Sequence, residues 1–179
     1  MRNTIKALAL AGAAMITMPA AAQDAAVSKA VAADYDAHLE ELFVHFHENP
    51  ELSFLETDTA KRMAAELRAA GAEVTEGVGR TGVVGIMKNG EGPLILLRAD
   101  MDGLPVEEKT GLPYASDATQ TGRDGKEYPV MHACGHDVHI TSMVGTARRL
   151  AAMKDQWSGT AMFVVQPAEE VVGGAEAMM

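Results

Sequence analysis

The second half of the chain runs through a strand, a helix and a strand, and this order restricts the fold more than any other feature. Two short apolar runs, Leu94–Leu97 and Ala161–Val165, predict strands, and the first has the pattern of a strand buried on both faces. Between them, apolar residues recur at helical spacing from Ile140 to Ala151. Such a succession typically forms a right-handed crossover between parallel strands. We therefore expect an α/β fold with a largely parallel sheet covered by helices.

Two further helices and one strand are expected in the first half. Apolar positions at helical spacing predict helices over 36–49, where an Asn-Pro pair ends the pattern, and over 56–70. Gly71 follows the second helix, at the place of a left-handed C-terminal cap. The run 83–87 lies among glycines and predicts a strand, whereas 111–129 lacks periodicity and predicts a loop.

The N-terminus has the three-part layout of a secretory signal peptide. Arg2 and Lys6 precede an apolar run over 7–18, and a proline and three alanines follow it. A membrane anchor is the weaker alternative, because a run of about 12 residues is shorter than the ~20 that span a bilayer. We expect a signal peptide of residues 1–22, removed to leave a mature chain of residues 23–179 that is secreted or periplasmic and not membrane-bound.

The composition excludes some classes of partner. The chain carries 25 acidic against 15 basic side chains, a net charge of −10, so it would repel the phosphates of a nucleic acid. With 47% hydrophobic residues, it has the composition of a folded soluble protein. Its single cysteine, Cys134, rules out an intramolecular disulfide, so an exported chain would fold without covalent cross-links.

Three segments combine ligand-type side chains with positions next to strand ends or a helix start. They are Arg98–Gly103, His132–His139 and Gln166–Glu170. In open α/β sheets, the loops at the carboxyl ends of the strands form the binding crevice. We therefore expect the three segments to converge on one site.

The chemistry of these side chains favours a divalent metal. Cys134 and His136 flank a glycine that permits a sharp turn, and thiolate and imidazole are strong ligands for such ions. Glu169 and Glu170 offer oxygen donors, provided that an irregular backbone lets neighbouring side chains reach one centre. One glutamate could then bind the metal while the other transfers protons, which predicts metal-assisted hydrolysis.

Other interpretations stay open for some of these residues. Asp100 and Asp102 could cap a turn or support metal ligands. Cys134 could act as a nucleophile with a histidine base, but His136 is too near in sequence to face it, and the glutamate pair would have no role. We expect solvated or structural roles for the remaining candidates, Glu40, Glu41, Glu107, Glu108, His45 and His47.

The motifs also resemble a known family. The strings "HACGHD" and "PAEE", with "LRADMDGLPVEEKTGLPYAS" and "HENPELSFLETDTA", resemble in order and spacing the metal-dependent amidohydrolases of the aminoacylase and carboxypeptidase group. The most similar branch contains hippurate hydrolases and indole-acetyl-amino-acid hydrolases. The resemblance extends from His45 to Gly174 and implies part of a catalytic domain of the zinc-peptidase type.

The resemblance implies a role for each matching residue. Cys134, His136 and Glu170 correspond to metal ligands, and Glu169 to the general base that activates the attacking water. Asp102 corresponds to an aspartate that orients or bridges. The family uses two divalent ions, most often manganese or zinc and sometimes cobalt or nickel. Its substrates are N-acyl amino acids, whose amide bond is cleaved.

The chain also departs from the family pattern. Asp100 stands where relatives outside this branch have a histidine ligand, so its role is open. Family members are considerably longer and contain a lid and dimerisation domain with further histidine ligands, whereas no histidine follows His139 here. We expect the N-terminal part of a catalytic domain without its lid, from a protein that could be a homodimer. The alternative is a truncated, inactive remnant that binds a metal or a partner.

Overall fold

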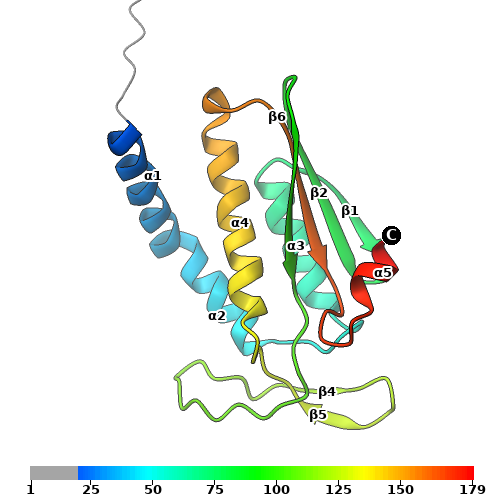
Figure 1. The fold of residues 1–179 in the computed structure, drawn as a ribbon. Helices are drawn as coiled ribbons and strands as arrows, with labels where there is room; N and C mark the ends of the chain where they lie inside the picture. The colour runs from blue at the N-terminus through cyan, green and yellow to red at the C-terminus, as the bar shows by residue number, and fades with distance from the viewer. Residues whose placement is uncertain (1–19) are drawn as a thin grey trace, which may run out of the picture.

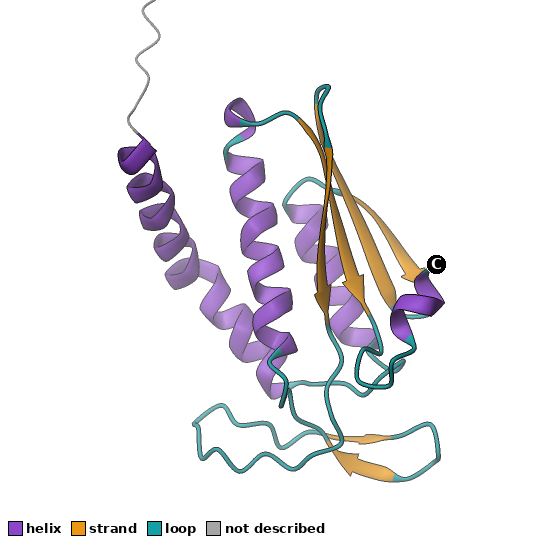
Figure 2. Cartoon of the chain, viewed as in Figure 1, coloured by secondary structure: helices purple, strands orange, loops and turns teal. Residues whose placement is uncertain are grey.

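The computed structural model describes residues 20–179, which form a four-stranded sheet with helices along it (Figure 1). The long helices lie on one side of the sheet, and a small two-stranded hairpin extends beyond one end of both layers (Figure 2). This arrangement confirms the expected α/β class.

The elements follow one another with short connections, except for the long excursion that carries the hairpin. In chain order they are α1 (Ala20–Asp34), the π-helical turn η1 (Tyr35–Leu39), α2 (Glu40–Glu48), α3 (Thr57–Ala69), β1 (Glu73–Val78), β2 (Gly82–Asn89), β3 (Leu94–Asp100), β4 (Thr119–Thr121), β5 (Glu127–Pro129), α4 (His136–Ala152), the 3₁₀ turn η2 (Lys154–Gln156), β6 (Gly159–Gln166) and α5 (Gly174–Met178). All the predicted helices and strands are present.

The sheet has the order β1-β2-β6-β3, and only its β3–β6 pair is parallel. Strands β1 and β2 form an antiparallel hairpin, and β2 pairs antiparallel with β6. The prediction of a largely parallel sheet therefore holds only for the pair that the crossover through α4 connects. The β1–β2 pair is antiparallel because a short turn joins the two strands, whereas β6 runs opposite to β2 and parallel to β3.

One apolar core fills the space between the helices and the sheet. Residues three and four positions apart on α3 and α4 face it, as their periodicity predicts. The core includes Met63, Ala64 and Leu67 of α3, Ile140, Met143, Val144 and Ala147 of α4, and Val83, Met87, Phe163 and Val165 of the sheet. Gly71 adopts a φ of +91° after α3, which confirms the predicted left-handed cap.

Strand β3 differs from its sequence-based expectation. It lies at an edge of the sheet, and Leu94, Ile95 and Leu96 are 58%, 61% and 55% exposed. The expectation of burial on both faces was therefore wrong for this part of the strand. Within the described residues no strand pairs with its free edge, so an apolar run alone overstated its burial.

The excursion between β3 and α4 also contains more structure than predicted. Its strands β4 and β5 form an antiparallel hairpin within the segment expected to be loop. Their burial pattern is mostly exposed, so they lack the apolar alternation that identifies a strand in sequence.

Most of the predicted signal peptide, residues 1–19, lies outside the described residues. Its expected cleavage point, after Ala22, falls in the first turn of α1. Within residues 20–179, none of the helices combines the length and the hydrophobicity that crossing a bilayer requires.

Candidate functional site

The parallel strand pair brings the three candidate segments together. Asp100, the last residue of β3, is in register with Gln166, the last residue of β6, and the Met101 amide donates to the Gln166 carbonyl. Helix α4 packs on β3 and begins at His136. The carboxyl ends of the two strands and the first turn of α4 therefore meet, as expected for a crevice in an open α/β sheet.

Asp102 connects all three segments. One carboxylate oxygen accepts the Glu169 amide and the other accepts the Glu170 amide, both at 3.0 Å, while Ser53 Oγ donates at 2.6 Å. The Asp102 carbonyl accepts a hydrogen bond from His136 Nδ1 at 2.8 Å. Burial opposes the charged form of Asp102, but its hydrogen bonds outweigh burial and lower its pKa. The side chain is thus a buried carboxylate that orients the two glutamates.

The loop that carries Glu169 and Glu170 has the irregular backbone that lets both side chains reach one metal centre. Ala168 has a φ of +49°, and its amide donates to Glu56 Oε1 at 2.8 Å. Glu56 is completely buried and also accepts the Phe54 amide at 2.9 Å. Glu56 and Asp102 therefore hold the backbone on both sides of the turn that presents Glu169 and Glu170.

His136 is the side chain on which the carboxylates converge. Its Nε2 lies 3.6 Å from Asp100 Oδ1, 3.7 Å from Glu169 Oε2 and 3.9 Å from Glu170 Oε1. Two tetrahedral ligands of one ion, each about 2.1 Å from it, lie about 3.4 Å apart. Because Nδ1 donates to the Asp102 carbonyl, the lone pair of a neutral ring is on Nε2, which faces the carboxylates. This spacing and these donor types fit a divalent cation.

Cys134 lies beside the same carboxylates. Cys134 is exposed, and its thiol forms a hydrogen bond with Glu170 that raises the thiol pKa; partial desolvation and the charges of Glu170 and Glu169 add to the effect. Gly135 follows with a φ of +78°, which allows the sharp turn into α4. The contact with a carboxylate rather than an imidazole argues against Cys134 as a nucleophile, since such attack needs a base that removes the thiol proton.

His139 and Asp100 form a second group of donors around His136. His139 Nδ1 donates to Asp100 Oδ1 at 2.6 Å, and its ring stacks on that of His136 with 5.5 Å between centroids. The donor atoms of these three residues lie within 4.8 Å of one another, as do those of His136, Glu169 and Glu170. His139 was not identified as a ligand from the sequence, because the helical pattern was predicted only from Ile140; α4 in fact begins at His136, which places the two histidines three residues apart on one helix face.

A buried network beside the site was also missed. His47 donates from Nδ1 to Asp137 at 2.6 Å and from Nε2 to Glu108 at 3.1 Å. Burial opposes its protonation, but the two carboxylates raise its pKa. The Glu108 carboxylate also accepts the Ser116 amide at 2.7 Å, so the expectation that it is solvated was wrong. The Glu108 carboxylate accepts hydrogen bonds from three donors because the loop that follows it folds back over it. A sequence pattern does not reveal this fold.

His132 is buried next to this network without a hydrogen-bond partner among the described residues for either ring nitrogen. Burial lowers its pKa to about 4. His136 behaves in the opposite way: burial opposes its charge, but the hydrogen bond with Asp102 and the charges of Asp100 and Asp102 raise its pKa to about 9. The first ring is neutral at pH 7 and the second lies in a strongly negative field.

The contribution of these two histidines to the stability of the metal-free chain is largest near pH 6.5. An unfolded histidine has a pKa of about 6.5, so a folded pKa of about 4 at His132 costs stability as the pH falls from 6.5 towards 4, by about 3 kcal/mol at most. The raised pKa of His136 stabilises the fold below pH 6.5, and this contribution is lost as the pH rises through about 9. Urea unfolding in the presence of a chelator, at pH values from about 4 to 9, measures the loss of unfolding free energy on both the acidic and the alkaline side.

The variant His132→Phe separates the two effects. It should remove the loss of unfolding free energy on the acidic side and leave the loss on the alkaline side. If this variant still loses unfolding free energy on the acidic side, His132 is not the group that causes the loss.

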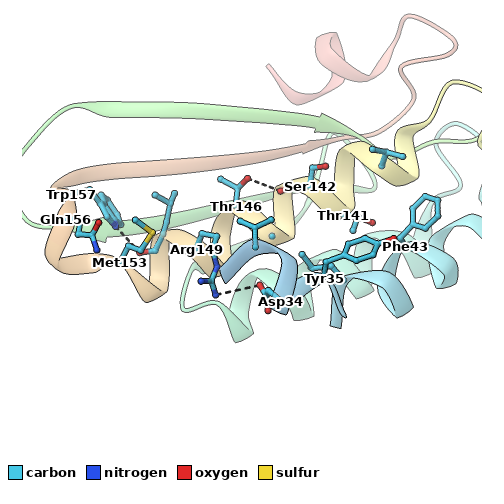
Figure 3. A pocket seen from close by; sticks show the side chains of 15 residues that line it. Asp34, Tyr35, Phe43, Thr141, Ser142, Thr146, Arg149, Met153, Gln156 and Trp157 are labelled. Carbon is cyan, nitrogen blue, oxygen red and sulfur yellow. Dashed lines mark hydrogen bonds and ion pairs between the residues drawn. The ribbon is translucent and has the colours of Figure 1, made fainter. Parts of the chain in front are cut away.

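A larger cavity of the described chain lies elsewhere. It measures about 640 Å³ and is bordered by α1, η1 and the outer face of α4 (Figure 3). Its wall is apolar, with Tyr35, Phe43 and Trp157, and its Asp34 is bound to Arg148 and Arg149. A smaller cavity of about 470 Å³ reaches Glu170. A catalytic site requires convergent polar groups, and Glu170 lines the smaller cavity, so we place the functional site there.

The chain is thus an α/β protein in which carboxylates and imidazoles at the strand ends could hold a metal ion, with the Cys134 thiol beside them. Residues 96–179 match the model of peptidase family M20/M25/M40. A hippurate hydrolase of Campylobacter jejuni is 46% identical over 147 residues, which are 82% of this chain and 36% of that protein. An N-acetylcysteine deacetylase of Bacillus subtilis is 42% identical over 135 residues, which are 74% of this chain and 33% of that protein.

Solved structures agree with these sequence relatives. A Bacillus subtilis protein described as a dinuclear metal binding peptidase from the M20 family superposes with a TM-score of 0.70 and 37% identity, over 80% of this chain and 38% of that one. Residues 96–179 carry a domain of peptidase family M20/M25/M40, as the resemblance of the motifs implied. The chain spans about a third of the length of the relatives it matches.

Proposed function

We propose that the chain forms part of a metal-dependent hydrolase that cleaves the amide bond of N-acyl amino acids or similar small amides. The observation that carries this proposal is the convergence of Glu169 and Glu170 on His136 Nε2, with the Cys134 thiol bonded to Glu170. The names of two relatives, a hippurate hydrolase and an N-acetylcysteine deacetylase, support the substrate class.

We assign Cys134, His136 and Glu170 as ligands of a divalent cation, manganese or zinc before cobalt or nickel. The carboxylate suits manganese, the thiolate favours zinc, and the imidazole binds most of these ions, so metal availability would decide among them. Asp100 and His139 would add donors for a second ion next to His136. The relative described as dinuclear supports a pair of ions.

A bound divalent cation would supply Lewis acidity, which polarises an amide carbonyl and makes water more acidic. The residues of the chain supply the remaining steps. The Glu169 side chain is 41% exposed and can take a proton from the attacking water and deliver it to the leaving nitrogen. Asp102 holds the Glu169 and Glu170 amides, which fixes the two carboxylates in separate roles.

The proposal is tested by hydrolysis of N-benzoylglycine with added manganese or zinc. Release of benzoate and glycine should require the metal and should stop on addition of a chelator. Failure of the chain to bind either metal would refute the proposal, because every assigned role depends on the ligand set.

The second candidate function is a catalytically inactive remnant that binds a metal or a partner protein. The exposed apolar edge of β3 favours it, because Leu94, Ile95 and Leu96 offer a surface for another chain. Metal binding without hydrolysis, and without any gain when the remaining segment of a longer relative is added, would favour this alternative. Activity that returns on such addition would favour the hydrolase.

We also propose that the chain is exported to the periplasm or the medium, and that a longer form is a homodimer. The charged start and the apolar run over residues 7–18 support export. Mass spectrometry of the protein expressed with its leader should find a mature N-terminus at Gln23. An intact Met1 in the mature protein would contradict export by cleavage.

A further inference from the structure

The cavity next to Glu170 has a mainly apolar wall. It measures about 470 Å³, which falls in the range of small-molecule sites. The segment around Ser53, the turn after Asp102 and the β4–β5 hairpin enclose it, and its apolar lining consists of Leu52, Leu55, Leu104, Pro105, Tyr128 and Val171. A ligand held there would lie directly beside the candidate metal ligands.

One cationic side chain, Arg123, lines this cavity among the described residues. Its guanidinium lies 5.4 Å from the centroid of the Phe54 ring. No carboxylate of the described residues lies within ion-pair distance of it, whereas the neighbouring Asp124 is bound to Lys126 at 3.2 Å and to Tyr128 at 2.8 Å. The exposed Arg123 guanidinium therefore has no carboxylate partner among the described residues, and its N–H groups can donate to a ligand.

An anionic group of a ligand in this cavity needs a cation to bind it. Asp100, Asp102, Glu169 and Glu170 cluster around His136, and the divalent ions proposed there would be held by carboxylates of this cluster. Arg98 does not line the cavity and is bound to Asp100 at 3.1 Å and to Gln166 at 2.8 Å. Among the described residues that line the cavity, Arg123 is the one cation that can attract the negative group of a substrate.

We propose that Arg123 determines specificity by binding the free carboxylate of the substrate, while the apolar wall of the cavity accepts the group attached to it. This inference rests on the proposed function, because it takes an N-acyl amino acid as the ligand and names the residue that recognises its acid group. Guanidinium and carboxylate form paired charge-assisted hydrogen bonds, which favour the acid over the corresponding amide.

The test compares the binding of N-benzoylglycine and N-benzoylglycinamide by calorimetry. The manganese-loaded Glu169→Gln chain is used, so that the ligand is not consumed. The acid should bind about 10-fold more tightly than the amide, and the added substitution Arg123→Gln should bring this ratio to about 1. Arg123→Lys should restore part of the preference, since it restores the charge without the paired geometry.

Arg80→Gln is the matched control. Arg80 stacks on the same Phe54 ring, at 4.6 Å from its centroid, but does not line the cavity. The control should keep the preference for the acid, and manganese affinity should be equal in all variants. An unchanged ratio in Arg123→Gln, or equal binding of acid and amide to the parent, would overturn the inference.

The two proposals fail in different ways. If the preference for the acid depends on Arg123 but the unsubstituted chain, with Glu169 intact, hydrolyses no substrate, the proposed function is refuted and the binding role of Arg123 is supported. Hydrolysis of N-benzoylglycine with a KM that Arg123→Gln does not change would refute the binding role and support the proposed function.

Discussion

Replacing Glu169 by glutamine is expected to lower kcat for N-benzoylglycine by 10²- to 10⁴-fold, the usual contribution of a positioned general base. Glutamine keeps the size of the side chain but cannot accept a proton. The Glu169 amide would still donate to Asp102, so the loop should keep its conformation. Steady-state kinetics with saturating manganese, together with calorimetric metal binding, measure both properties.

The matched variant is Glu170→Gln, one residue along the same turn. We expect it to weaken metal binding as well as turnover, because Glu170 is assigned as a ligand next to Cys134 and His136. Loss of metal affinity in Glu169→Gln, with full affinity in Glu170→Gln, would reverse the two assignments. Unchanged kcat in Glu169→Gln would remove Glu169 from the reaction.

The substitution Asp102→Asn is expected to have the second large effect. The carboxylate accepts from Ser53 and from the Glu169 and Glu170 amides, and an asparagine would turn an NH₂ group towards one of these donors. A buried donor without a partner costs 1–3 kcal/mol, so the free energy of unfolding should fall by about 3 kcal/mol. Metal affinity should fall about 10- to 100-fold, since the ligands lose their orienting group.

Urea unfolding and metal titration test this expectation, with Asp117→Asn as a control for the loss of one surface charge. Asp117 is exposed, so its substitution should change the unfolding free energy by less than about 0.5 kcal/mol. If Asp102→Asn were as stable as the control and bound metal equally well, Asp102 would not be the group that organises the site.

Much of the fold could be predicted because its long elements have strong periodicity. The helices over 36–49 and 56–70 and helix α4 bury one face against a common core, so their apolar spacing was informative. The parallel β3–β6 pair followed from the crossover rule. Strand β1 could not be found in this way, because its side chains are mostly exposed.

The exposure of β3 shows a limit of local pattern. Leu94–Leu97 is as apolar as a central strand, yet the burial of a strand depends on which neighbours pair with it. That information lies in segments distant along the chain. The same limit applies to the antiparallel pairs of the sheet.

The candidate site was predicted in part. His136 Nε2 lies 3.9 Å from Glu170 Oε1, and Cys134 is hydrogen-bonded to Glu170, whereas the two groups of three donors around His136 consist of carboxylates and imidazoles without the Cys134 sulfur. That Cys134, His136 and Glu170 share one ion stays a prediction. The resemblance predicted that Asp102 orients or bridges, and its hydrogen bonds to two backbone amides support an orienting role. The burial of Glu108 and the place of Arg123 depend on how a long excursion folds back, which no short motif encodes.

The most direct test of the account is the absorption spectrum and X-ray absorption of the cobalt-loaded chain. We predict one sulfur donor together with nitrogen and oxygen donors, because Cys134, His136 and Glu170 are expected to share one ion. The sulfur signal should disappear in Cys134→Ser and persist in Glu169→Gln. A coordination shell without sulfur in the unsubstituted chain would contradict the account.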